Sequence, residues 1–123
     1  MSADRLTLSQ IAWLIAYAFG MAGGQLLFKA AALRYAPDSS VGERILSLLY
    51  NGYFLSAVVL YVALTVLWVW LLTFTPLSRA YPFVALAFAI TPLLGGLVFN
   101  EPIAPRLLLG IGTVLVGLFL IAG

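Results

Sequence analysis

The sequence predicts an all-α membrane protein with four transmembrane helices, and three observations support this prediction. Apolar residues make up 64% of the 123 positions, whereas charged residues make up only 8%. A soluble domain carries about a quarter charged residues, so this chain lacks the charge needed to cover a water-facing surface. A helix crosses the hydrocarbon core in about 20 residues, and the charged positions divide the chain into uncharged stretches that fit four such helices.

The four helices are expected to form a single domain over residues 1–123. Their expected ranges are about 8–33, 52–74, 80–99 and 105–122, with a short interfacial segment over 41–50. The first helix follows from the uncharged run between Arg5 and Lys29, and Pro37 with Asp38 marks its exit. The interfacial segment VGERILSLLY is amphipathic and too short to cross the membrane, so it is expected to lie at the interface.

Arginines and prolines delimit the remaining helices. The second helix is expected to end before Pro76, and the third covers the uncharged run that follows Arg79. The fourth runs from about Pro105 to the end of the chain. Lys and Arg are slightly more numerous on the side opposite the N-terminus, a small bias that favours an outside N-terminus and also permits both orientations.

Several classes of chemistry are excluded by composition. The chain has no His and no Cys, which removes the commonest general base, thiol chemistry, disulfides and the usual zinc and haem ligand sets. The net charge of +2 is too small to suggest nucleic-acid binding. The sequence therefore predicts a protein that is not an enzyme, with no catalytic residues, no metal, no cofactor and no nucleic-acid partner.

Small residues recur at helical spacing in the first and fourth predicted helices. Gly20 and Gly24 form a small-xxx-small pair, and Gly110, Thr113 and Gly117 share one face of the last helix. Such faces let helix backbones approach closely in lipid. We expect a dimer in which the last helix is a contact. Packing within one chain is the alternative, and the glycines of the first helix could equally line a substrate path.

The third predicted helix contains a proline followed by two glycines. Pro92 removes one helix hydrogen bond, and Gly95 with Gly96 lies just beyond it. This pattern is typical both of a hinge for alternating access and of a static bend. We therefore treat Pro92, Gly95 and Gly96 as a candidate hinge.

The polar residues near the helix ends are candidates for substrate contact. Gln25 and Lys29 are four residues apart and share a helix face, so they could present an amide and an ammonium to an anionic headgroup, although Lys29 could instead snorkel to the interface. Arg79 could bind phosphate or mark the membrane edge. Glu101 could form an ion pair with Lys29 or Arg106, or carry a proton. No Asp or Glu lies inside a predicted span, so the site favours an anion over a cation.

The stretch GQLLFKAA at 24–31 and the run from Pro76 to Gly123 resemble the drug/metabolite transporter superfamily. Its smallest members include small multidrug resistance exporters and the related subunits that flip undecaprenyl-phosphate-linked aminoarabinose. The resemblance is closer to the flippase subunits, which similarly carry Gly-Gln with a Lys four residues later, an Ala-Tyr-Pro, and a Glu-Pro followed by Pro-Arg. These positions here are Gly24, Gln25, Lys29, Ala80, Tyr81, Pro82, Glu101, Pro102, Pro105 and Arg106.

The resemblance implies a small multidrug resistance/EamA-like fold in the bacterial inner membrane, assembled as a homodimer or as a heterodimer with a similar small subunit. It also implies translocation of a polyprenyl-phosphate-linked sugar, or a related anionic lipid, between leaflets. The predicted substrate-binding residues are Gln25, Lys29, Arg79, Tyr81, Glu101 and Arg106. Multidrug exporters are expected to carry a Glu in the first helix, and its absence here argues against cation/proton antiport. The alternatives are export of small amphipathic compounds and a non-transporting accessory subunit of a membrane glycosyltransferase.

Overall fold

The computed structural model describes residues 6–34 and 40–122, and in these ranges the chain is built of helices and short connections. The four long helices are α1 (Leu8–Ala32), α3 (Gly52–Leu72), α5 (Val84–Phe99) and α6 (Pro105–Ala122). Two shorter helices are α2 (Val41–Leu49) and α4 (Leu77–Ala80), and the 3-10 turn η1 (Tyr81–Phe83) joins α4 to α5. Arg5, Pro37 and Asp38, which helped to delimit the first helix, lie outside the described residues.

Three helical stretches are long and apolar enough to cross a membrane. They are Leu8–Ala32, Gly52–Leu72 and Leu77–Phe99, the last of which combines α4, η1 and α5. The fourth apolar helix, described over Pro105–Ile121, is shorter. The chain is therefore a multi-pass membrane protein, and its third apolar stretch begins three residues before the helix start expected at 80.

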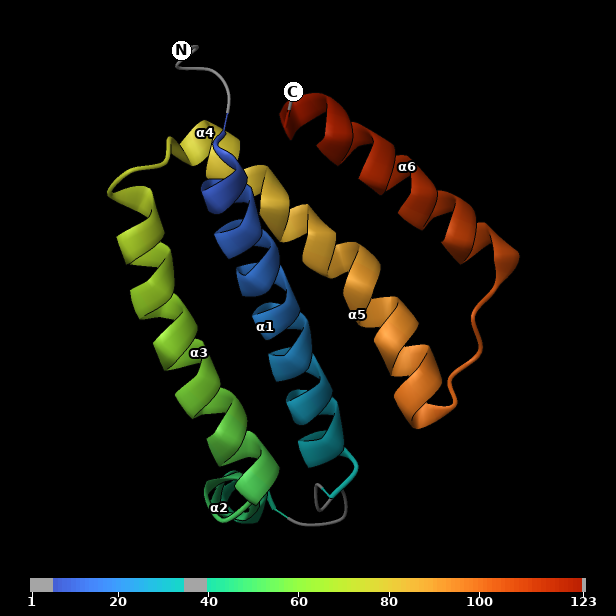
Figure 1. Ribbon diagram of the computed structural model, residues 1–123. Helices are drawn as coiled ribbons and strands as arrows, with labels where there is room; N and C mark the ends of the chain where they lie inside the picture. Colours follow the sequence, from blue (N-terminus) through green and yellow to red (C-terminus); the bar gives the residue numbers. More distant parts are fainter. Residues whose placement is uncertain (1–5, 35–39, 123) are drawn as a thin grey trace.

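The long helices form an open row in which α1 is central. Figure 1 shows α3 and α5 on opposite sides of α1, with α6 on the far side of α5. Large apolar side chains on every long helix remain exposed, for example Val59, Phe88 and Phe119. In water such a surface would be unfavourable, whereas lipid tails or a second protein chain can cover it.

Glycines allow the close approach of α1 to α3. A Cβ atom on Gly20 would lie 2.7 Å from Cδ2 of Leu64, and one on Gly24 would lie 2.5 Å from Cε2 of Tyr61. Real carbon atoms do not approach so closely, so these two positions need glycine unless the side chains of α3 move. Gly20 and Gly24 therefore pack within the chain.

The glycines of α6 have the opposite surroundings. A Cβ atom on Gly110, Gly112 or Gly117 would meet nothing within 4 Å. Thr113 lies on the same helix and donates its hydroxyl hydrogen to the backbone oxygen of Leu109 over 2.9 Å. The described part of the chain therefore leaves the small-residue face of α6 uncovered.

The end of the bundle near the N-terminus holds the main apolar core. Its buried members are Leu14, Leu71, Ala80, Phe83 and Leu118, drawn from α1, α3, α4, η1 and α6. Thr7 and Gln10 form a reciprocal capping box at the start of α1, and Gln10 also donates a hydrogen bond to the backbone oxygen of Phe74 over 2.9 Å. These contacts hold the start of α1 against the end of α3.

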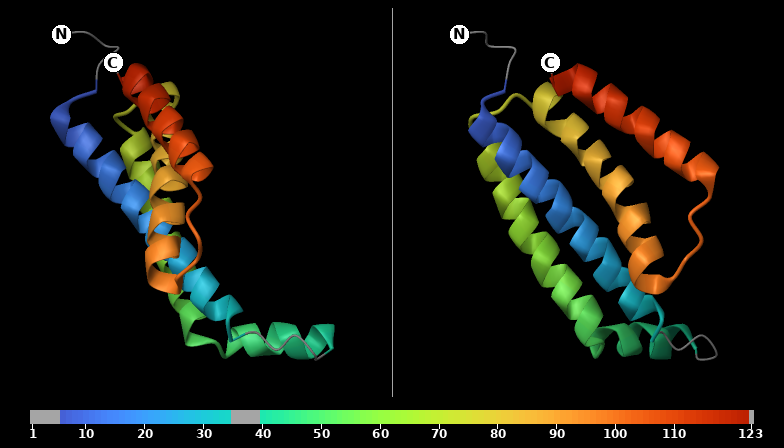
Figure 2. Two further views of the ribbon diagram at one scale, coloured as in Figure 1. Left: turned by 90° about the vertical axis from the view of Figure 1, so that its right-hand side faces the viewer. Right: turned by 45° about the vertical axis from the view of Figure 1, so that its right-hand side comes forward.

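The opposite end of the bundle carries the amphipathic helix α2, which has no buried residues. Figure 2 shows α2 lying crosswise to α1 and α3. Its apolar side chains Val41, Ile45 and Leu49 are each at least half exposed. A crosswise amphipathic helix of this kind is typical of a segment lying in the membrane interface.

Candidate substrate-binding site

A polar pair lies between the apolar helices α1 and α3. Gln25 Nε2 donates a hydrogen bond to the Tyr61 hydroxyl over 2.8 Å, and that hydroxyl donates to the backbone oxygen of Met21 over 3.0 Å. Phe28 stacks on the Tyr61 ring with 5.4 Å between ring centroids, which fixes the ring. Within the described residues the carboxamide oxygen of Gln25 makes no hydrogen bond, so it can accept one from a ligand.

Two pockets flank Gln25. The first has a volume of about 370 Å³ and is lined by Met21, Gln25, Ala87, Phe88, Thr91 and Pro92 of α1 and α5. The second has a volume of about 410 Å³ and is lined by Gln25, Phe28, Val58, Tyr61, Val62 and Thr65 of α1 and α3. The walls of both pockets are largely apolar, and Gln25 lines each pocket with a polar side chain.

One turn further along α1, Lys29 meets Glu101. The Lys29 Nζ and the Glu101 Oε2 are 3.7 Å apart, and the two side chains are 43% and 50% exposed. Of the alternatives left open by the sequence, the structure therefore places Glu101 beside Lys29. Where water reaches it, a long, half-exposed ion pair of this kind contributes about 0–1 kcal/mol to the stability of the fold. A ligand with charges of its own can therefore replace either partner.

The segment that carries Glu101 packs closely against the glycines of α5. Asn100 ends α5 with φ 55° and ψ 34°, a left-handed conformation that turns the chain back. A Cβ atom on Gly96 would collide with the Ile103 side chain, and one on Gly95 would lie 3.5 Å from Glu101 Oε1. Gly96 therefore makes room for the turn that brings Glu101 to α1, whereas a Cβ atom on Gly95 would be in ordinary van der Waals contact. Their role as a hinge with Pro92 stays a prediction.

The other three predicted binding residues lie apart from this group. Arg79 in α4 donates a hydrogen bond to the backbone oxygen of Ile121 over 2.7 Å, where the last carbonyls of α6 attract a cation. Tyr81 is 61% exposed and lies edge-on to Trp68 with 6.4 Å between centroids. Both belong to the end of the molecule opposite α2 (Figure 1). Arg106, in the first turn of α6, is exposed and makes no polar contact within the described residues.

The sequence did not single out Tyr61. A signal was present, because a phenol in the middle of an apolar helix needs a hydrogen-bond partner when lipid replaces water. The identity of that partner depends on the register of α1 against α3. That register is set by contacts such as Gly24 against the Tyr61 ring.

Three of the six predicted residues thus lie at or beside α1, Arg79 and Tyr81 lie at the end of the bundle opposite α2, and Arg106 lies apart from both groups. Gln25 and Lys29 lie one turn apart on α1, and Glu101 lies beside Lys29. Residues 4–123 of the chain match the family described as EamA-like transporters. The chain belongs to the EamA-like transporter family. The match includes every predicted binding residue and all the described helices.

Two curated relatives of this EamA-like chain are flippase subunits by name. The probable 4-amino-4-deoxy-L-arabinose-phosphoundecaprenol flippase subunit ArnE of Enterobacter sp. (strain 638) is 35% identical over 101 residues, which is 82% of this chain and 85% of the relative. The protein of the same name from Hamiltonella defensa is 40% identical over 55 residues, covering 45% of this chain and 50% of the relative. No solved structure matches this chain at a significant level.

Proposed function

We propose that this EamA-like chain translocates a polyprenyl-phosphate-linked sugar between the leaflets of a bacterial inner membrane. The observation that carries the proposal is the position of Gln25 on the central helix α1, where it lines two apolar pockets, with Lys29 one turn further along the same helix face. The name of the Enterobacter relative supports the same class of substrate, an amino sugar linked to a phosphorylated polyprenol.

Each part of such a substrate has a chemical counterpart around α1. The Lys29 ammonium would bind the phosphate, since a charge-assisted hydrogen bond is stronger than a neutral one. The free carboxamide oxygen of Gln25 would accept a hydrogen bond from a sugar hydroxyl. The polyprenyl tail would remain in the bilayer, next to the apolar walls of the pockets.

Glu101 extends this scheme to a sugar that carries an amine. A substrate with both a phosphate and an ammonium would exchange partners with the Lys29–Glu101 pair, and no uncompensated charge would be left in the membrane. We also propose that Tyr81 contacts the headgroup at the end of the bundle opposite α2, where the substrate leaves the protein. Arg79 would hold α6 in place at that end. Arg106 would attract the anionic headgroup from its exposed position.

A second subunit would complete the path. The open row of helices and the uncovered glycine face of α6 support assembly with another copy of this chain or with a similar small subunit. Bending of α5 at Pro92 would let the α1–α5 pocket, which Pro92 lines, open toward either side.

Translocation is tested with purified protein in proteoliposomes that contain a fluorescent polyprenyl-phosphate sugar. Loss of the outer-leaflet signal is timed against protein-free vesicles. Wild-type protein should accelerate equilibration, and Lys29→Ala should slow it by about tenfold or more, because a hydrogen bond to a charged group is lost. Ser9→Ala, which changes an exposed side chain in the first turn of α1, should flip lipid at the wild-type rate.

A protein with exchanged charges distinguishes phosphate binding by Lys29 from a purely structural ion pair between Lys29 and Glu101. Lys29→Glu combined with Glu101→Lys keeps an ion pair in place but moves the positive charge off α1. If Lys29 only stabilises the fold, the swap should restore transport; if Lys29 binds the phosphate beside Gln25, it should not. Folded Lys29→Ala protein that flips lipid at the wild-type rate would contradict the proposed site.

A further inference from the structure

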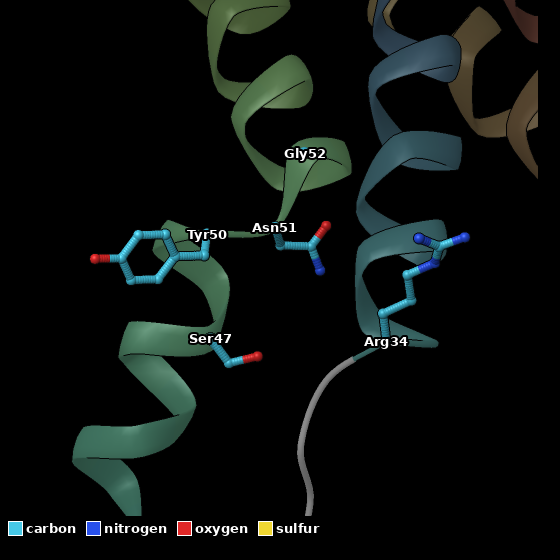
Figure 3. Close-up of a pocket in the computed structure, with 5 residues that line it drawn as sticks. All are labelled: Arg34, Ser47, Tyr50, Asn51 and Gly52. Carbon is cyan, nitrogen blue, oxygen red and sulfur yellow. The ribbon is translucent and has the colours of Figure 1, made fainter.

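A third pocket, of about 270 Å³, lies where α1, α2 and α3 meet. It is lined by Arg34, Ser47, Tyr50, Asn51 and Gly52 (Figure 3). Unlike the pockets beside Gln25, it is bordered mainly by polar atoms. In Figure 3 the Ser47 hydroxyl and the Asn51 carboxamide point toward the side where Arg34 stands, whereas the Tyr50 ring points away.

The Arg34 guanidinium is oriented but still available to a ligand. Its central carbon lies 4.8 Å from the centroid of the Tyr53 ring, so the aromatic face holds the cation without using its N–H groups. Within the described residues no carboxylate pairs with Arg34. Because a guanidinium presents several N–H donors in a fixed plane, Arg34 can bind a phosphate oxygen pair at its open edge.

A buried asparagine makes the pocket a built feature of the fold. Asn51 is 9% exposed and uses both ends of its side chain. Its Nδ2 donates to the backbone oxygen of Ala31 over 3.1 Å, and its Oδ1 accepts from the amides of Tyr53 and Phe54 over 3.0 and 3.4 Å. This residue ties the end of α1 to the start of α3, which fixes the pocket walls.

Two further donors are available at the pocket. The Ser47 hydroxyl makes no hydrogen bond within the described residues, and the same holds for the peptide N–H of Gly52 at the start of α3. On α2, Glu43 and Arg44 both lie within one turn of Ser47, and their opposite charges offset each other. The positive charge at the pocket therefore comes from Arg34.

The position of α2 sets the depth of the pocket in the membrane. The exposed apolar side chains of this crosswise helix belong in the interface, and Tyr50, which is 82% exposed, is of the type enriched at that level. Lipid phosphates lie in the same layer. We propose that this pocket binds the phosphate group of a membrane lipid, with Arg34 as the charged ligand and Ser47 as a second donor.

This site is separate from the one proposed for transport. Lys29 meets Glu101, which follows α5, whereas Arg34 stacks on Tyr53 of α3, on the opposite side of α1. The pocket therefore serves as a resident lipid site or as the point where a phosphorylated lipid docks before translocation. A resident phospholipid and a polyprenyl phosphate would both bind through their phosphate group, so the experiment supplies each lipid separately to distinguish them.

The test uses delipidated full-length protein in detergent and native mass spectrometry. Phosphatidylglycerol, polyprenyl phosphate and uncharged diacylglycerol are titrated separately, and retained lipid is counted. Wild-type protein should retain one of the phosphorylated lipids but not diacylglycerol. In a Lys29→Ala background, which removes the phosphate ligand proposed for transport, Arg34→Gln should reduce that retention by about tenfold. Ser9→Ala changes an exposed side chain in the first turn of α1, at the other end of that helix from Arg34, and should retain lipid as wild type does.

A second variant keeps Arg34 and its aromatic contact. Ser47→Asp places a negative charge in the pocket, and it should also reduce retention of the phosphorylated lipid, with thermal unfolding used to confirm that the protein is folded. Retention of phosphatidylglycerol would identify a resident phospholipid, and selective retention of polyprenyl phosphate would identify a docking site. Equal retention with and without Arg34→Gln and Ser47→Asp, or an equal loss in Ser9→Ala, would overturn the proposal whatever the transport assay shows.

Discussion

The α1–α3 interface and the outer face of α6 carry similar small-residue patterns in opposite surroundings. On α1, Cβ atoms at Gly20 and Gly24 would overlap Leu64 and Tyr61 of α3. On α6, Cβ atoms at Gly110 and Gly117 would meet nothing within 4 Å. Helices in lipid associate through close packing, because the lipid tails are as apolar as the side chains. The α1 glycines are thus already used within the chain, whereas those of α6 stay available to another chain.

This difference separates residues that stabilise the fold from residues that would stabilise an assembly. The α1–α3 interface also holds the Gln25–Tyr61 hydrogen bond, so its packing and the candidate site depend on each other. The α6 face holds no comparable contact to the rest of the described chain. Substitutions at the two surfaces should therefore affect different measurements.

Gly24→Leu should have the largest effect on stability. The added side chain would displace the Tyr61 ring, and overpacking of this kind costs about 1–3 kcal/mol in the free energy of unfolding. Thermal unfolding in detergent measures it. Gly23→Leu is the matched control, because a Cβ atom on Gly23 meets nothing within 4 Å, and it should stay within about 0.5 kcal/mol of wild type. Equal losses in both variants would contradict the described α1–α3 packing.

Tyr61→Phe should have a smaller effect at the same interface. The ring and its stacking on Phe28 remain, but the hydroxyl that links Gln25 to the Met21 carbonyl is removed. Interhelical hydrogen bonds in membranes are worth about 0.6–2 kcal/mol, and a loss in the lower half of this range is expected from thermal unfolding. Tyr50→Phe removes an exposed hydroxyl and should be neutral. An unchanged Tyr61→Phe protein would show that the polar pair does not support the interface.

Gly117→Leu should have the smallest effect on the stability of a single chain, within about 0.5 kcal/mol. It should instead weaken association, because it fills the face through which α6 would approach a partner. Cross-linking in liposomes at increasing dilution measures the monomer fraction, which should rise for Gly117→Leu and remain at the wild-type level for Gly23→Leu. Wild-type association by folded Gly117→Leu protein would exclude this face as the subunit contact.

Much of the candidate site could be predicted from the sequence. The four-residue spacing places Gln25 and Lys29 on one helix face, and the scarcity of carboxylates left few partners for Lys29. Tyr61 was missed, and so was the pocket at Arg34, because each depends on contacts between helices that are distant in the chain. The sequence could not place Arg79 and Tyr81 relative to Lys29, since that depends on how α4 and α6 meet.

The sequence by itself determined the solvent in which this protein folds. Its apolar content and scarcity of charge leave only the bilayer as an environment, and every backbone polar group must then be satisfied within helices. Only the tertiary structure decided which glycines are covered, which charged side chains pair and which neighbouring helix each polar side chain of α1 contacts. Those outcomes depend on the register and tilt of packed helices. In lipid, register and tilt are set by steric fit between distant residues rather than by any local pattern.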